Sequence, residues 1–153
     1  MTAQTLPRRR TAGALLTAGI VTLAAATGYI HLTLGGLLFL LSGLGYVGLI
    51  VLVVVGAIGP HPLVRRFDWF PRLALIGYAG MTIVGYLVMG PYFALGWFTK
   101  GIEVALFALV VVDVFRVYGS PRAMARLAIA SVFGERGPVG ADRPATADAA
   151  QQA

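Results

Sequence analysis

The chain has 153 residues, of which 58% are hydrophobic and only 12% charged, and its formal net charge is +6. Soluble domains carry about 25% charged residues, so this composition, with a mean hydropathy of +0.83, excludes a water-soluble globule. The absence of cysteine excludes disulfides, thiolate metal sites and a cysteine nucleophile.

Four hydrophobic stretches follow one another along the chain, each of about 20 residues, long enough to cross a hydrocarbon core about 30 Å thick as a helix. Breaks separate them: the pair Gly35 and Gly36, a loop over residues 59–72 with prolines at both ends, and Gly90 followed by Pro91. A polar N-terminal segment, residues 1–10, precedes the first stretch. The sequence therefore predicts an all-α membrane protein, whose domain, residues 11–118, is a bundle of four transmembrane helices over 11–34, 37–58, 73–90 and 97–117.

Two further segments follow the fourth stretch. Ser120 and Pro121 are typical of an N-cap with proline at the first helical position, and Gly134 of a helix end. The spacing of the apolar residues between them predicts an amphipathic juxtamembrane helix over residues 119–134, lying on the inner leaflet. Residues 135–153 are rich in Ala, Pro, Gly, Asp and Gln, and we expect them to be disordered.

Positive residues in short loops are retained on the cytoplasmic side of a membrane. With four spans, Lys100 lies on one side, and nine arginines lie on the other: Arg8, Arg9, Arg10, Arg65, Arg66, Arg72, Arg116, Arg122 and Arg126. This asymmetry predicts a multi-pass plasma-membrane protein, typical of a bacterium, with both termini in the cytoplasm. The lipid bilayer is then the expected partner of the arginines, through anionic headgroups, and nucleic acid is not.

The first stretch also resembles a cleavable secretory signal, because arginines precede it and three alanines occupy residues 24–26. The apolar stretch continues past that point through residues 28–30. We therefore expect it to be retained as a signal anchor.

Small residues recur at three- to five-residue spacing and are typical of helix–helix contact in lipid. They are Ala14, Ala18, Thr22 and Ala26 in the first stretch, Ser42, Gly45 and Gly48 in the second, and Gly77, Gly80 and Gly85 in the third. We expect these faces to pack inside the bundle, with oligomerisation as the alternative.

Glu103 is the carboxylate placed inside the apolar region, about one helical turn from the outer interface. A charge at that depth must be neutralised, paired or turned toward a polar cavity. Lys100 lies three residues earlier on the same helical face, and His31 lies at the outer end of the first stretch. Glu103, Lys100 and His31 therefore form the candidate polar cluster, either as a packing device or as a proton- or ligand-binding site.

The remaining polar residues favour structural roles. Asp113 and Arg116 form an i,i+3 pair near the inner end of the fourth stretch, and Tyr46 and Tyr86 need interhelical partners for their hydroxyls. His61 has no companion metal ligand in the sequence. With no second membrane histidine for a haem and no phosphate-binding, metalloprotease or serine-elbow motif, we expect no cofactor, no metal and no catalytic residue.

Four segments carry a resemblance to a family: YIHLTLG (29–35), LFLLSGLGY (38–46), TIVGY (82–86) and TKGIEVAL (99–106). Together they resemble an uncharacterised family of small four-helix integral membrane proteins of actinobacteria and haloarchaea, over about residues 12–117. The resemblance implies the four-helix fold and places His31, Lys100 and Glu103 in the similar segments, without implying an activity. The predicted four-helix arrangement also resembles that of small multidrug exporters. Those proteins carry their essential glutamate in the first span, where this chain has none.

Three functions remain open from the sequence. The first is a non-enzymatic accessory or structural component, with a larger membrane complex or a homo-oligomer as its assembly. The second is a small proton-coupled carrier that acts as a homo-oligomer through Glu103. The third, a membrane redox or quinone-linked enzyme, would need cofactor ligands that the sequence lacks.

Overall fold

The computed structural model describes residues 6–59 and 61–134, and within these residues it contains helices and no strand. In chain order the helices are α1 (Leu6–Thr33), α2 (Leu37–Ile58), α3 (Pro62–Arg66), α4 (Trp69–Met89), α5 (Ala94–Tyr118) and α6 (Pro121–Phe133). The predicted N-terminal segment in part, and the predicted disordered tail entirely, lie outside the described residues.

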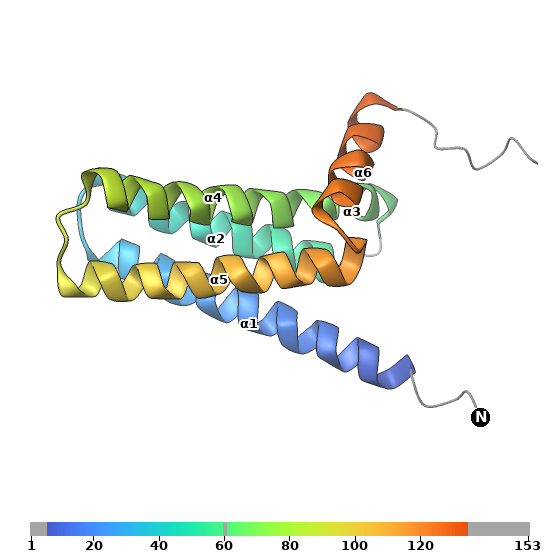
Figure 1. The fold of residues 1–153 in the computed structure, drawn as a ribbon, viewed down its shortest axis with the longest axis horizontal. Coiled ribbons are helices and arrows are strands. Elements are labelled where there is room, and N and C mark those ends of the chain that lie inside the picture. The colour runs from blue at the N-terminus through green and yellow to red at the C-terminus, as the bar shows by residue number, and fades with distance from the viewer. Residues whose placement is uncertain (1–5, 60, 135–153) are drawn as a thin grey trace, which may run out of the picture.

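The long helices α1, α2, α4 and α5 run side by side, and the short helices α3 and α6 lie together at one end (Figure 1). Helix α1 contacts α2 and α5, and α4 contacts α5 and α2. The N-terminal half of α1 diverges from the other long helices, whereas α6 crosses their common direction (Figure 1). Each long helix therefore contacts two other long helices and has an outward-facing side.

Three helical segments are long and apolar enough to cross a membrane: Thr11–Thr33 of α1, Leu37–Ile58, which is the whole of α2, and Trp69–Met89, the whole of α4. Large apolar side chains also cover the outside of the molecule, for example Leu37, Met81 and Val88, each more than 60% exposed. Such a surface suits lipid and would be unusual in water. The prediction of an all-helical protein is confirmed for the described residues, and three of the helices could cross a membrane.

Several helices extend beyond the predicted hydrophobic stretches. Helix α1 begins at Leu6, α4 at Trp69 and α5 at Ala94. Pro71 does not delay α4, because a proline in the first helical turn removes an N–H that has no helical partner there. A hydrophobic stretch predicts only the part of a helix that suits the hydrocarbon core. These helices are longer than their hydrophobic stretches, so they begin earlier than predicted.

The segment predicted to be only a loop, residues 59–72, contains α3. His61 is its N-cap, accepting a hydrogen bond at Nδ1 from the Leu63 N–H at 3.3 Å, and Pro62 occupies the first helical position. Histidine is an uncommon N-cap, so the sequence pattern did not predict this turn. His61 therefore has a local capping role.

Helix α6 has the ends that the sequence predicts. The Ser120 hydroxyl accepts a hydrogen bond from the Ala123 N–H at 3.1 Å, and Gly134 ends the helix in a left-handed conformation. Met124 is buried with Trp69 and Val114, which fixes α6 against α4 and α5.

The core lies between the long helices and consists of buried apolar side chains: Ile20, Ala24, Tyr46, Leu49, Leu75, Leu106 and Val110. Helices α1 and α2 approach closely where Gly28 and Gly43 face each other, since a Cβ on Gly43 would lie 3.0 Å from the Gly28 carbonyl oxygen. Gly45 similarly admits the Tyr78 ring of α4, whose hydroxyl would lie 2.1 Å from an added Cβ.

The small-residue face predicted for the first stretch does not pack inside the bundle. Ala14, Ala18 and Thr22 are exposed, and α1 instead buries Ile20, Ala24, Thr27, Gly28 and His31. Thr27 and His31 carry polar groups that are costly to expose to lipid, and this requirement outweighs the benefit of close backbone approach at alanines. Ala26, the fourth residue of this face, is half-buried. The prediction that the face packs inside the bundle is wrong for Ala14, Ala18 and Thr22, and oligomerisation through it stays a prediction.

Candidate functional site

Helix α5 supplies the polar residues at the centre of the bundle. Its buried residues include Lys100, Glu103, Leu106, Val110 and Asp113, which follow one helical face at three- and four-residue spacing. Glu103 and Asp113 are ten residues apart and therefore about 15 Å apart along the helix axis. The buried face thus carries one carboxylate in each half, with apolar side chains between them.

Glu103 is completely buried. Its carboxylate accepts hydrogen bonds from one side chain of α1 and from one side chain of its own helix, α5. Thr27 of α1 donates from Oγ1 to Glu103 Oε1 at 3.2 Å. The Lys100 ammonium of α5 donates to the other oxygen, Oε2. The carboxylate is therefore paired and hydrogen-bonded, as a charge at this depth requires.

Lys100 connects the same site to α4. Its Nζ donates to the Thr82 carbonyl oxygen at 3.1 Å and lies 5.4 Å from the centre of the Tyr86 ring. The ring face attracts the ammonium electrostatically. Lys100, 7% exposed, is thereby turned into the bundle rather than toward the headgroups.

His31 completes the site from α1. Its Nδ1 lies 2.8 Å from the Thr27 carbonyl oxygen, and its Nε2 lies 3.7 Å from Glu103 Oε1. The structure thus brings together all three residues of the predicted cluster. We define the outer cluster as Glu103, Lys100, His31 and Thr27. The names outer and inner for the two ends of the bundle follow the orientation that the arginine asymmetry of the sequence predicts.

Aromatic side chains surround the outer cluster. The Tyr46 ring of α2 lies 5.8 Å from the His31 ring, and its hydroxyl lies 3.2 Å from Thr82 Oγ1. Tyr78 packs edge-on against Tyr46, with ring centres 4.9 Å apart. Side chains of all four long helices therefore meet at this depth.

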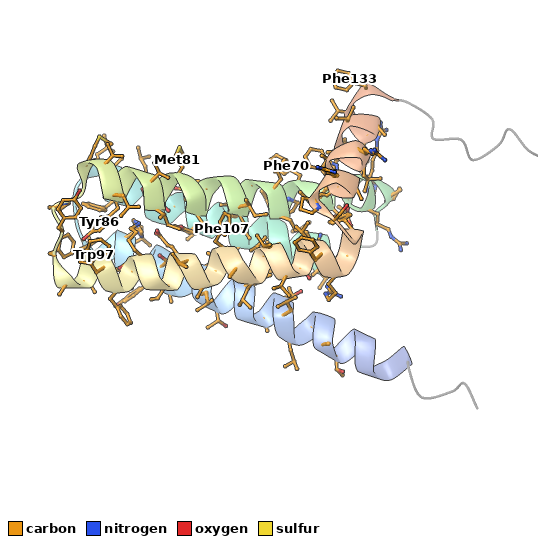
Figure 2. The ribbon with its side chains drawn as sticks, in the orientation of Figure 1. Phe70, Met81, Tyr86, Trp97, Phe107 and Phe133 are labelled. Atoms are coloured by element: carbon orange, nitrogen blue, oxygen red, sulfur yellow. The ribbon has the colours of Figure 1, made fainter. Side chains whose placement is uncertain are left out.

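A second aromatic group closes the outer end of α4 and α5. Figure 2 shows Tyr86 and Trp97 pointing toward each other, and their ring centres are 5.5 Å apart in a T-shaped arrangement. The Tyr92 ring stacks on Trp97, and the Tyr86 hydroxyl donates to the Phe93 carbonyl oxygen at 3.3 Å. The partner of the Tyr86 hydroxyl therefore lies in the connection between α4 and α5, at the N-cap of α5, and not on another helix as predicted. The Tyr86 ring also lies against Lys100.

Asp113 is the centre of an inner cluster. It is 2% exposed and lies between two arginines: Arg72 of α4 donates from Nε to Oδ2 at 2.7 Å, and Arg116 donates to Oδ1 from Nη2 at 2.6 Å. Arg72 also donates to the Asp68 carbonyl oxygen, and the Tyr118 hydroxyl donates to Asp68 Oδ1 at 2.9 Å. The predicted Asp113–Arg116 pair is present, and Arg72 extends it into a link between α4 and α5.

A small cavity lies beside the inner cluster. Its volume is about 40 Å³, and residues of α1, α2, α4 and α5 line it, among them Thr17, Gly56, Arg72 and Asp113. A single water needs about 10–15 Å³ measured in this way, so the cavity has room for water.

Two contributors to these clusters escaped the sequence analysis. Thr27 lies four residues before His31, and this spacing places both on one helical face. Thr27 and Glu103 are 76 residues apart in the sequence, so no local pattern predicts their contact. Arg72 was assigned to the headgroup region with the other inner arginines. Arg72 precedes the third predicted stretch and Asp113 lies near the end of the fourth, so both are expected at the inner side of the membrane, and this shared depth was the available signal.

Within residues 6–59 and 61–134, no three His, Asp or Glu side chains come together in a way that could hold a metal ion. Within residues 11–59 and 61–134, every side-chain nitrogen and oxygen atom that is completely enclosed has a hydrogen-bond partner. The chemistry that the outer cluster offers is accordingly that of a carboxylate, an ammonium and an imidazole: charge pairing and proton binding.

The helices and the two charged clusters define the class as an all-helical membrane protein with ionic links inside its bundle. Comparisons with protein-family models, with curated proteins and with solved structures found no match to this chain.

Proposed function

We propose that the chain is a four-span plasma-membrane protein of a bacterium, with α5 as the fourth span and both termini in the cytoplasm. Helix α5 has 25 residues, about 37 Å of helix, which exceeds the hydrocarbon thickness. Three of its four charged residues, Lys100, Glu103 and Asp113, are buried against other helices. The fourth, Arg116, is exposed near the inner end of the helix, so the outward side is apolar over the rest of its length. The arginine asymmetry supports the orientation.

Within this membrane fold, the function supported best is that of a non-enzymatic accessory or structural component. The observation that carries the proposal is that the side chains of Glu103 and Lys100 make hydrogen bonds to other helices. Their polar atoms are engaged by Thr27 of α1 and Thr82 of α4, so the charges hold three helices together. The outward faces of the helices are then free to contact lipid or further subunits of a larger complex.

Exposed residues of α4 offer one such face. Leu73, Met81, Val84 and Val88 recur along the helix at three- to eight-residue spacing, each at least 46% exposed. Figure 2 shows Met81 on the side of α4 that points away from the bundle. In a membrane this face would contact either acyl chains or a neighbouring helix.

Gentle extraction from native membranes tests the proposal. The tagged chain is solubilised in mild detergent, and proteins that co-elute at constant stoichiometry through two separations are identified by mass spectrometry. We expect a co-eluting membrane protein or a homo-oligomer. Met81→Lys, which places a charge on the outward face of α4, should reduce co-elution if that face is the contact, and Arg122→Gln is the control on exposed α6. A chain that elutes as a bare monomer from native membranes would contradict an accessory role.

A proton-coupled carrier acting as a homo-oligomer through Glu103 is the second candidate. One specific observation favours it: a buried carboxylate faces a histidine imidazole in the outer half, while a cavity that reaches Asp113 and Arg72 lies in the inner half. Leu106 and Val110 separate the two sites on α5. Proteoliposomes with a pH gradient and an internal pH dye provide the test, because wild type should dissipate the gradient faster than Glu103→Gln.

A further inference from the structure

The hydrogen bond between His31 and Thr27 determines which nitrogen of the neutral imidazole carries its hydrogen. A backbone carbonyl oxygen can only accept, so His31 Nδ1, 2.8 Å from the Thr27 oxygen, must be the donor. In the neutral ring Nε2 is then an acceptor with an exposed lone pair. The ring also contacts two tilted aromatic rings, with its centre 5.8 Å from that of Tyr46 and 6.0 Å from that of Phe39, and these contacts support its orientation.

The lone pair of Nε2 faces a second acceptor. Glu103 Oε1 lies 3.7 Å away, beyond hydrogen-bond distance, and already accepts from Thr27 Oγ1. Two acceptors that face each other repel unless a proton lies between them. The distance and the fixed orientation therefore describe a site that lacks one proton.

We infer that His31 Nε2 and Glu103 Oε1 form a proton-binding site, in which one added proton closes the gap and ties the outer end of α1 to α5. The proton comes from a hydronium ion in the water at the outer end: one O–H bond of the hydronium breaks, an N–H bond forms at Nε2 and donates to Oε1, and a neutral water molecule leaves. With Lys100 cationic and Glu103 anionic, the charge of the outer cluster goes from zero to +1.

The titratable and charged groups around this proton come from every neighbouring helix. They are Lys100 and Glu103 of α5, Tyr46 of α2, and Tyr78 and Tyr86 of α4, which reach the site through Tyr46 and Lys100 respectively. The carboxylate is the nearest of the charged groups to Nε2. It favours the added proton, whereas Lys100, held by Oε2, opposes it.

The sign of the effect on stability follows from linkage. The added proton makes a hydrogen bond between α1 and α5 that the unfolded chain cannot make. The stabilisation is then present at acid pH and is lost as the pH rises. Glu103→Gln reverses the effect, because a Gln amide can donate to Nε2, which keeps the native imidazole neutral while the unfolded one still protonates.

The test is the unfolding temperature of the full chain in lipid nanodiscs from about pH 8 to about pH 5, the range in which histidine titrates. His31→Gln is the reference that removes all other pH effects, and His61→Asn is the matched control, since His61 is the other histidine and caps α3. Relative to His31→Gln, we expect wild type and His61→Asn to gain about 3 °C toward acid pH. Glu103→Gln should gain nothing or lose stability. Parallel curves for wild type and His31→Gln would overturn the proton site.

A second measurement needs no variant in the cluster. Nitrogen-15 NMR of His61→Asn, labelled at histidine, reports on His31 alone. We expect Nδ1 protonated and Nε2 bare at about pH 8, and both protonated at about pH 5. A bare Nδ1 at the higher pH, or no second proton at the lower, would overturn the inference. This site deepens the carrier hypothesis without depending on it: a normal titration in a protein that moves no protons across liposomes would refute transport alone.

Discussion

Arg72 of α4 donates from Nε to Asp113 of α5 across 2.7 Å, and this ion pair links two helices at the inner end of the bundle, about three helical turns from Glu103. Asp113 is 2% exposed, so its charge depends on its two arginines for compensation. Arg72 contributes across the helix interface, and Arg116 contributes from the same helix. Arg72 therefore stabilises the contact between α4 and α5, whereas Arg116 stabilises the charge of Asp113 within α5.

Replacing Arg72 by Gln should destabilise the protein more than replacing Arg116. Removing one partner of a fully buried pair costs about 3–5 kcal/mol, and we expect roughly half of that for Arg72, about 2 kcal/mol, because its side chain is 23% exposed. Arg116→Gln, at 39% exposure and within one helix, should cost less than about 1 kcal/mol. Reversible unfolding in detergent measures both, with exposed Arg122→Gln as the control. An Arg116 effect equal to that of Arg72 would contradict the interhelical role.

Adding a methyl group at Gly45 should disturb the contact between α2 and α4. The Tyr78 hydroxyl would lie 2.1 Å from the new Cβ, so the ring must move and lose its hydrogen bond to the Ser42 carbonyl oxygen. We expect Gly45→Ala to cost about 1–3 kcal/mol, as overpacking does. Gly48→Ala is the matched control one helical turn away, because nothing lies within 4 Å of its added Cβ. Equal stabilities of the two variants would show that Tyr78 does not pack there.

Reporter fusions test the proposed topology. Fusions after residues 34, 66, 95 and 153 should report outside, inside, outside and inside, because arginines flank the inner ends of the helices and Lys100 alone is placed toward the outer end. A periplasmic signal at residue 66 would contradict the four-span arrangement.

The sequence predicted those parts of the fold that depend on hydrophobic length and on local capping. Helix α2 has the predicted bounds, and α6 begins and ends at the predicted residues, since Ser120 and Gly134 act within one helical turn. It failed on the face of α1, because the rotation of a helix depends on partners distant in sequence. Only the three-dimensional structure places Thr27 against Glu103 and so explains why Ala14, Ala18 and Thr22 face outward.

The candidate site was predictable in its residue types and in its depth. A carboxylate inside an apolar stretch needs a partner, and Lys100 at i−3 is the partner that a helix provides. The orientation of His31 was not predictable, because it depends on a hydrogen bond to a backbone carbonyl. That orientation decides whether the cluster is a closed ion pair or a site with room for one more proton.

The central claim is that Lys100 and Glu103 act as one buried pair that holds the bundle together, and a double-mutant cycle tests it most directly. Lys100→Met and Glu103→Leu each leave one buried charge without its partner, so each should cost about 3 kcal/mol in reversible unfolding. The double variant removes both charges and should be at least 1 kcal/mol more stable than the sum of the single costs predicts. Single costs that add to within about 0.5 kcal/mol would contradict the claim, since they would show that the two side chains stabilise the protein independently.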